Sequence, residues 1–316
     1  MPPNLSLFTE FRVPPNSGTL TIVTGPDGNL WFTEQEAGKV AKMTPAGVFT
    51  EYAVPTYVAG PHGIATGPDG DIWFTELDAG KVAKVTTAGV FTEYTIPTPN
   101  SGPLNIAAGP DGNMWFTEGT ANKVAKVTTS GVFTEYAVPR AISGPSGIVA
   151  GPDGNLWFAE SSSYTQGTEV FTGAVAKVTT SGVFTEYLIP TPSSQPQEIA
   201  VGPDGNLWFV EASAYKIGKV TTSGMFTEYD ARAVGESAPP ALRPTYPIGI
   251  ALGSDGNLWF LDFARVGKIT TSGIVTKYAI PATFAGPPMG ITSGPDGNIW
   301  FTGPDGVARL TVSLAA

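Results

Sequence analysis

The feature that most constrains this chain is a motif that recurs seven times in its 316 residues. A Gly-Pro/Ser-Asp-Gly turn begins at Gly25, Gly67, Gly109, Gly151, Gly202, Gly253 and Gly294, with successive spacings of 42, 42, 42, 51, 51 and 41 residues. Every tryptophan follows one of these turns at the same offset. Repeats of about 42 residues indicate a solenoid or a propeller, in which each unit buries its apolar faces against its neighbours.

Residues 61 to 97, "PHGIATGPDGDIWFTELDAGKVAKVTTAGVFTEYTIP", show how one unit divides. Four short stretches rich in β-branched and aromatic residues are separated by turns that contain glycine. No helical periodicity interrupts them. The pattern predicts four antiparallel strands per unit, which is one blade of a β-propeller.

The two ends of the chain predict a closed ring. The last unit stops at "GVARLTVSLAA", which matches only a third strand, whereas "SLFTEFRVP" near the N-terminus matches the fourth strand of the other units. We therefore predict an all-β, seven-bladed propeller in a single domain, residues 1–316, whose N-terminal strand completes the last blade and removes exposed strand edges. The expected segments are a closing strand at 5–14 and blades at 15–56, 57–98, 99–140, 141–191, 192–242, 243–283 and 284–316.

Composition excludes several classes of function. The chain has no cysteine, which excludes disulfides and thiolate metal sites, and its net charge of −10 argues against nucleic acid or an anionic membrane as partner. No apolar run approaches the ~18 residues of a membrane helix. The start, "MPPNLSL", lacks the features of a signal peptide, which slightly favours the cytoplasm but leaves localisation open, because an export signal removed earlier would leave the same start. We expect a monomer.

One face of the predicted ring is the better place for a site. In a four-stranded meander, the loops that lead into strand one and leave strand two lie on the same face, and both long insertions, residues 161–173 and 230–247, fall there. Binding residues concentrate on loops held by a rigid scaffold. Arg140, Arg232 and Arg243 lie in such loops and could receive an anionic or carbonyl-rich ligand, with solvated loop positions as the alternative.

One residue per blade, at the start of the inner strand, is expected to line the mouth of the channel. This residue differs in nearly every blade, and four of the seven are apolar: Leu20, His62, Leu104, Ser146, Gln197, Ile248 and Met289. Such a lining predicts a cup for an organic ligand. The alternative is that these side chains only plug the channel.

A second residue per blade, at the end of the "WFTE" strand, is also expected to point into the mouth. It is a carboxylate in six blades: Glu34, Glu76, Glu118, Glu160, Glu211 and Asp262, with Gly303 in the seventh. Carboxylates could hold a divalent cation, with Glu76 as the candidate metal ligand. The alternative is rim ion pairs with the lysines five residues later, Lys39, Lys81 and Lys123. We interpret the "PDG" segments as turns, because they lack the further acidic ligands of calcium loops.

The unit "GPDGNLWFTE…KVAKVTTSGVFTEYxIP" resembles the virginiamycin B lyase (streptogramin lyase) family over essentially the whole chain. The resemblance implies a seven-bladed propeller that opens a cyclic depsipeptide antibiotic at its ester linkage by elimination, with Mg²⁺ at the top of the channel. It also implies a catalytic histidine on one inner strand. In the next blade it implies a Glu-Pro-His element, followed by a glutamate that ends the "WFTE" strand.

The match to this catalytic set is partial. Pro61-His62 corresponds to the Pro-His pair and Glu76 to the later glutamate, which makes His62 and Glu76 the candidate catalytic residues. Gly60 stands where the first glutamate is implied, and Leu20 where the partner histidine is implied. Elimination needs a base and an electrophile, and His62 could be the base if Glu76 or a metal orients it. A hydrogen-bonded rim histidine is the alternative.

Three functions stay open. We favour a diverged propeller with an incomplete catalytic set, which binds a small organic or cyclic peptide ligand at the channel mouth, or a protein. The alternative is a carbon–oxygen lyase that linearises a cyclic depsipeptide of the streptogramin B type by magnesium-assisted elimination, so the cofactor is Mg²⁺ or none. A third interpretation is a recently amplified or engineered repeat protein, because "KVTTSGVFTEY" recurs unchanged in blades three and four.

Overall fold

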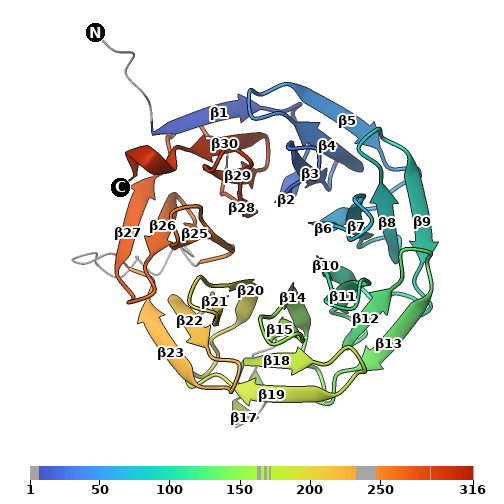
Figure 1. Ribbon diagram of the computed structural model, residues 1–316, viewed down its shortest axis with the longest axis vertical. Helices are drawn as coiled ribbons and strands as arrows, with labels where there is room; N and C mark the ends of the chain where they lie inside the picture. The colour runs from blue at the N-terminus through green and yellow to red at the C-terminus, as the bar shows by residue number, and fades with distance from the viewer. Residues whose placement is uncertain are drawn as a thin grey trace.

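The computed structural model describes residues 7–161, 165–166, 169–170, 172–232, 247–284 and 286–315. Seven four-stranded antiparallel sheets surround one axis (Figure 1). Within the described ranges the single helix is a 3-10 turn, η1 (Val312–Leu314), and no helix there is long and apolar enough to cross a membrane. The prediction of an all-β, seven-bladed propeller is confirmed.

Each blade runs from an inner strand at the axis to an outer strand at the rim. Blade one holds β2 (Thr19–Thr24), β3 (Leu30–Glu34), β4 (Lys39–Met43) and β5 (Phe49–Ala53); blade two holds β6 (Pro61–Thr66), β7 (Ile72–Glu76), β8 (Lys81–Val85) and β9 (Phe91–Thr95). Blade three holds β10 (Pro103–Ala108), β11 (Met114–Glu118), β12 (Lys123–Val127) and β13 (Phe133–Ala137). Blade four holds β14 (Pro145–Ala150), β15 (Leu156–Glu160), β18 (Ala174–Val178) and β19 (Phe184–Leu188), with a small hairpin, β16 (Thr165–Gln166) and β17 (Glu169–Val170), between β15 and β18.

The remaining blades follow the same order. Blade five holds β20 (Pro196–Val201), β21 (Leu207–Glu211), β22 (Lys216–Val220) and β23 (Phe226–Asp230), and blade six holds β24 (Ile250–Leu252), β25 (Leu258–Asp262), β26 (Arg265–Ile269) and β27 (Val275–Ala279). Blade seven holds β28 (Ile291–Ser293), β29 (Ile299–Gly303), β30 (Gly306–Leu310) and β1 (Phe8–Arg12).

The N-terminal strand closes the ring as predicted. β1 pairs antiparallel with β30 over a register that runs from Phe8 opposite Leu310 to Arg12 opposite Gly306. In Figure 1 the dark blue β1 lies at the rim beside the red C-terminal strands. Phe11 stacks on Trp300 with ring centroids 5.2 Å apart, so the seam is packed as well as hydrogen-bonded.

The repeated tryptophan joins each blade to the next. Trp31 is fully buried and packs in one cluster with Ile64, Ile72 and Phe74 of blade two. Its indole N–H donates to Asp27 of the preceding turn at 3.0 Å, and the same bond recurs in all seven blades. The interpretation of the "PDG" segments as turns fits this geometry, because the aspartate is already a tryptophan acceptor.

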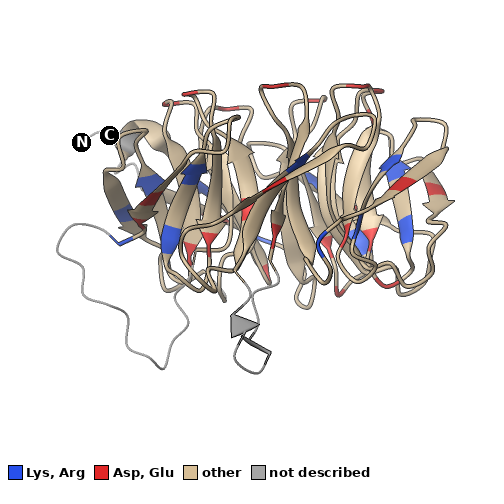
Figure 2. Ribbon diagram, turned by 90° about the horizontal axis from the view of Figure 1, so that it is seen from below, with Lys and Arg blue, Asp and Glu red and all other residues tan. Residues whose placement is uncertain are grey.

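The inner strand carries a β-bulge that sets the wall of the channel. In blades one to five the inner strand has one extra residue relative to the second strand. In blade two, for example, Pro61 lies opposite Glu76 and Ile64 lies opposite Phe74. Bulges re-aim side chains and are common next to functional sites. Seen edge-on, the blades stand side by side in a flat ring (Figure 2).

Candidate functional site

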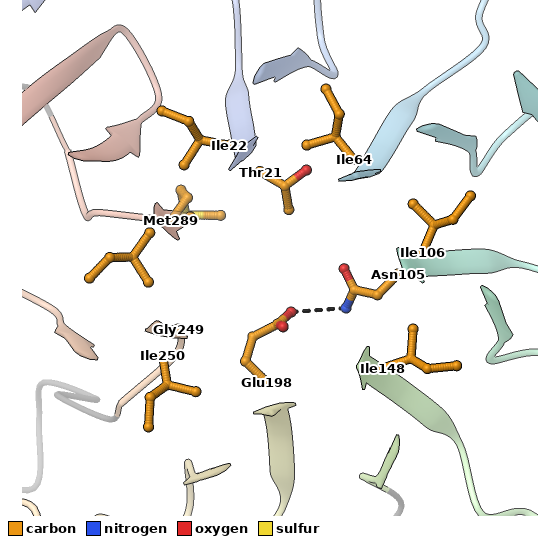
Figure 3. A pocket seen from close by; sticks show the side chains of 12 residues that line it. Thr21, Ile22, Ile64, Asn105, Ile106, Ile148, Glu198, Gly249, Ile250 and Met289 are labelled. Atoms are coloured by element: carbon orange, nitrogen blue, oxygen red, sulfur yellow. Dashed lines mark hydrogen bonds between the residues drawn. The ribbon is translucent and has the colours of Figure 1, made fainter. Parts of the chain in front are cut away.

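Two adjoining cavities lie on the axis of the ring and share Thr21, Glu198 and Met289. The inner cavity has a volume of about 180 Å³, and its wall is a ring of isoleucines (Figure 3). The outer cavity has a volume of about 330 Å³. A larger hollow of about 410 Å³ lies at the rim, where β1 meets blade seven, and is separate from the axis.

Five of the seven residues expected at the channel mouth line the outer cavity: Leu20, His62, Gln197, Ile248 and Met289. Phe263 and Pro287, which follow the second strand of blade six and precede the inner strand of blade seven, complete the wall. This places the cavity on the face expected from the loop insertions. Leucine, isoleucine, methionine, phenylalanine and proline side chains form much of its wall, as expected for a cup that takes an organic ligand.

Leu104 and Ser146 depart from the expectation, because neither lines either of the two axial cavities. The Ser146 hydroxyl donates to the backbone carbonyl of Gln197 at 3.1 Å, in the next blade. The Leu104 side chain lies against Gly119, where an added Cβ would be 2.8 Å from Leu104 Cδ1. Ser146 thus bonds to the next blade, whereas Leu104 packs against Gly119 of its own blade.

The bulge also exposes a ring of residues that sequence reasoning missed. Thr21, Asn105 and Glu198, each one position after the expected residue, point into the channel (Figure 3). A plain strand would turn two successive side chains to opposite faces, but a bulge can direct both inward. The sequence does contain a signal for these residues. Four of the seven blades have a glycine before the inner-strand isoleucine, and the three polar residues replace it in the others.

The threonine of "WFTE" holds the bulges in place. Thr33 Oγ1 donates to the His62 carbonyl at 2.9 Å, and Thr75 Oγ1 donates to the Leu104 carbonyl at 2.6 Å. The bond from Thr302 Oγ1 to the Leu20 carbonyl, at 2.5 Å, repeats this contact across the seam of the ring. The polypeptide around the channel is therefore anchored from the neighbouring blade, which positions the site before any ligand arrives.

His62 is half-buried in the wall of the outer cavity, and its Nδ1 has no hydrogen-bond partner. Burial lowers its pKa from 6.5, and the Leu104 carbonyl and the Asp78 carboxylate oppose that shift only partly. His62 is therefore neutral at pH 7 and can accept a proton.

Glu198 is the only carboxylate among the residues that line the two cavities. Its Oε1 accepts a hydrogen bond from Asn105 Nδ2 at 2.9 Å (Figure 3). Burial raises the pKa of Glu198 to about 7, although the bond from Asn105 acts in the opposite direction. The carboxyl group therefore changes charge near neutral pH.

The expectation that the "WFTE" carboxylates point into the mouth is wrong. Glu76 is fully buried inside blade two, lines neither cavity and has no hydrogen-bond partner on either oxygen, so no hydrogen bond joins it to His62. The expected ion pairs are also wrong, because Lys81 pairs with Glu93 of the outer strand at 2.9 Å. Lys39 and Lys123 likewise pair with Glu51 and Glu135.

Burial raises the pKa of several of these carboxyl groups well above its ordinary value. Burial raises the pKa of Glu76 to about 8, and the neighbouring charge of Glu93 adds to that shift. The same causes raise the pKa of Glu118 to about 8. In blade six the outer-strand glutamate is replaced by Lys277, whose ammonium lies 2.7 Å from the Asp262 carboxylate. Blades one to five thus have a buried glutamate next to an outer-strand glutamate. In blade six the buried Asp262 forms an ion pair with Lys277 instead.

Neither Arg140 nor Arg232 lines the axial cavities. Arg140 lies outside both cavities, and its guanidinium is 3.6 Å from the buried Glu160 carboxylate. This ion pair explains why Arg140 is mostly buried, and ligand binding by Arg140 stays a prediction. Arg232 forms an ion pair with Asp230, and Arg243 lies outside the described residues.

The described residues do not fit the implied Mg²⁺. No three histidine or acidic side chains come together there in a group that could hold a metal ion. The axial cavities offer one carboxylate, Glu198, whereas a hard cation in a protein site usually takes oxygen ligands from several groups. Metal binding by Glu76 stays a prediction, without further ligands from the described part of the chain.

Together, the fold and the cavities define a seven-bladed propeller with two adjoining cavities on its axis. Comparison with protein families identifies the family of this chain. The sequence model of the virginiamycin B lyase family matches residues 4–239 and 167–314. The chain belongs to this family.

Solved structures of lyases are similar to the whole chain. A streptogramin B lyase is 34% identical, with 96% of this chain and 97% of that chain covered and a TM-score of 0.86. The virginiamycin B lyase of Staphylococcus aureus is 35% identical, with 96% and 98% covered and a TM-score of 0.85. A catalytically inactive histidine-to-alanine variant of the S. aureus enzyme, with quinupristin, is 34% identical over the same coverage, also with a TM-score of 0.85. Comparison with curated protein sequences gave no match.

The buried carboxyls predict that stability falls as pH rises. Their pKa values are raised in the folded state, so their stabilising contribution is complete below the unfolded value of 4.5 and is lost as pH rises through about 8. Glu118→Gln removes one such group and should reduce the loss of unfolding free energy between pH 5.5 and 8.5 by about 1 to 3 kcal/mol.

Urea unfolding followed by tryptophan fluorescence at the two pH values measures this difference. Glu36→Gln is the matched control, because Glu36 is exposed and its substitution makes the same formal change. An equal pH dependence in Glu118→Gln and in the wild type would contradict the assignment of a raised pKa to Glu118.

Proposed function

We propose that this propeller binds a small organic molecule in the axial cup and performs no ring-opening chemistry. The observation that carries the proposal is the pair of adjoining cavities on the axis, about 330 and 180 Å³ in volume, which share three lining residues. Small-molecule sites are concave, mostly apolar and supplied with a few placed polar groups. The cup has this composition: isoleucine, leucine and methionine side chains around Thr21, His62, Asn105 and Glu198.

The missing partners of His62 support binding over catalysis. Opening an ester-linked ring by elimination requires a base that takes the proton next to a carbonyl and a group that stabilises the enolate as the C–O bond breaks. His62 can supply the base. However, Glu76 is buried in the blade and contributes nothing to the cup, and Arg140 is committed to Glu160. No cationic side chain lines the two cavities to stabilise the enolate.

The second candidate is a carbon–oxygen lyase that linearises a cyclic depsipeptide. One observation favours it: the single histidine of the chain lines the outer cavity and is neutral at pH 7, because burial lowers its pKa. Family membership adds to this, because a related enzyme is catalytically inactive when one histidine is replaced by alanine. A lyase that works through His62 would need its electrophile from outside the described residues.

Filling the cup should abolish binding. Leu20→Trp places a larger ring in the outer cavity and should weaken the binding of axial ligands at least tenfold, because the indole occupies their space. The measurement is ligand-observed NMR with a fragment library, followed by titration of each hit against wild type and variant. Val183→Trp, at an exposed turn, is the control and should bind as the wild type does. Hits that bind both variants equally would contradict the proposal.

Incubation with a type B streptogramin and Mg²⁺ separates the two candidates. We expect the cyclic substrate to be recovered intact, because the cup lacks the electrophile that elimination requires. Liquid chromatography with mass spectrometry is the measurement: elimination gives a linear isomer of unchanged mass at a new retention time, whereas hydrolysis adds one water. A linear isomer that disappears with His62→Ala would overturn the binding proposal in favour of the lyase.

A further inference from the structure

The ring of residues at the bulge is asymmetric, and three of its seven members are polar. In blade order it reads Thr21, Gly63, Asn105, Gly147, Glu198, Gly249 and Gly290. A Cβ on Gly63 would lie 2.3 Å from the Leu104 carbonyl oxygen, and one on Gly147 would lie 2.4 Å from the Gln197 carbonyl oxygen. These blades cannot carry a side chain here without moving the neighbouring backbone. Blades one, three and five have polar side chains at this position, and all three converge on the axis (Figure 3).

Glu198 is the one acidic residue in the largely apolar wall of the inner cavity. Its neighbours in the wall of the inner cavity are isoleucines, Met289, Thr21 and Asn105. Among the described residues that line either cavity there is no lysine or arginine, and His62 is neutral at pH 7. Holding a carboxylate in such a place is costly unless a counter-charge or hydrogen bonds compensate it.

The contacts of Glu198 leave one oxygen for a ligand. Asn105 Nδ2 donates to Oε1 at 2.9 Å, which fixes the carboxyl group between blades three and five. No side chain or backbone group in the described part of the chain donates to Oε2. The carboxylate is thus oriented by one bond and presents a free acceptor to the adjoining cavities.

We propose that the axial cup is a site for an apolar ligand that carries a protonated amine, with the ammonium group on Glu198 Oε2 and the apolar part against the isoleucine and leucine side chains. This inference rests on the proposed function and names its ligand class. An ammonium supplies both the hydrogen-bond donor and the counter-charge that Glu198 lacks. An anionic ligand is disfavoured, because no described cation faces the cavities and the carboxylate would repel it. A single carboxylate is also a poor site for a divalent cation.

Three probes of matched shape test the inference: 4-phenylbutylamine, 4-phenylbutan-1-ol and 4-phenylbutanoate, each titrated into the full chain by isothermal calorimetry at pH 8. We expect the amine to bind at least tenfold more tightly than the alcohol, and the carboxylate to give no measurable binding. Glu198→Gln should bring the amine to the affinity of the alcohol. Glu36→Gln, an exposed substitution of the same kind, should leave all three affinities unchanged.

A second measurement uses the wild type alone and does not depend on the variant being folded. Burial raises the pKa of Glu198 to about 7, so the carboxyl is mostly protonated at pH 5.5 and mostly ionised at pH 8. The affinity of the amine should therefore rise several-fold between these values, while that of the alcohol stays constant. His62, the other titratable group that lines the cavities, gains a positive charge only toward acid pH, which weakens amine binding in the same direction.

The outcomes separate this inference from the proposed function. If amine and alcohol bind equally, or if Glu198→Gln keeps the preference for the amine, the amine inference is overturned and the binding function stands. If none of the three probes binds at millimolar concentration while Leu20→Trp also leaves every fragment titration unchanged, both fall. A tenfold preference that is lost in Glu198→Gln and kept in Glu36→Gln supports both.

Discussion

The pairing of β1 with β30 is the constraint on which the rest of the structure depends. It joins residues about 300 positions apart in sequence, such as Phe8 and Leu310, and turns seven similar blades into a ring. The seam repeats the contacts of the other interfaces: Trp300 packs in one cluster with Ile22, Leu30 and Phe32 of blade one. Because the interface between blades seven and one is packed like the other blade interfaces, the inner strands of all seven blades surround one axis.

The same geometry explains why the polar contacts within the blades repeat, whereas the side chains that line the axial cavities differ from blade to blade. The frame repeats its polar contacts from blade to blade: an aspartate holds each tryptophan, and a lysine pairs with the outer-strand glutamate in several blades. At the axis the blades differ, because the neighbouring backbone leaves no room for a Cβ on Gly63 or Gly147, whereas other blades carry a polar side chain there. Side chains that vary between the repeats therefore reach a common volume at the axis from several blades.

The repeat period, the tryptophan spacing and the N-terminal match to a fourth strand were sufficient to predict the fold. The turn and the tryptophan recur seven times, so one misread unit would not change the number of blades, and the single N-terminal match predicted how the ring closes. Five residues of the outer cavity, His62 among them, were predicted because they occupy one variable position per blade. The face of the ring was predicted from the two insertions.

The rest of the site depended on backbone details that sequence patterns do not show. Glu198 was missed because a regular strand would turn it away from its neighbour Gln197, and only the bulge directs both toward the axis. Glu76 was placed in the mouth because it ends its strand, but its carboxyl turns into the blade beside Glu93. Arg140 was taken for a free loop cation because the depth of its partner Glu160 is a tertiary property.

The central claim is that the closed ring creates one axial pocket, and isoleucine methyl NMR tests it most directly. Six isoleucines from six blades line the inner cavity: Ile22, Ile64, Ile106, Ile148, Ile250 and Ile291. Titration of 4-phenylbutylamine into the methyl-labelled protein should shift the signals of several of these blades together, with one common affinity. The exposed Ile142 and Ile274 should not move. Shifts confined to those two, or to a single blade, would contradict the account.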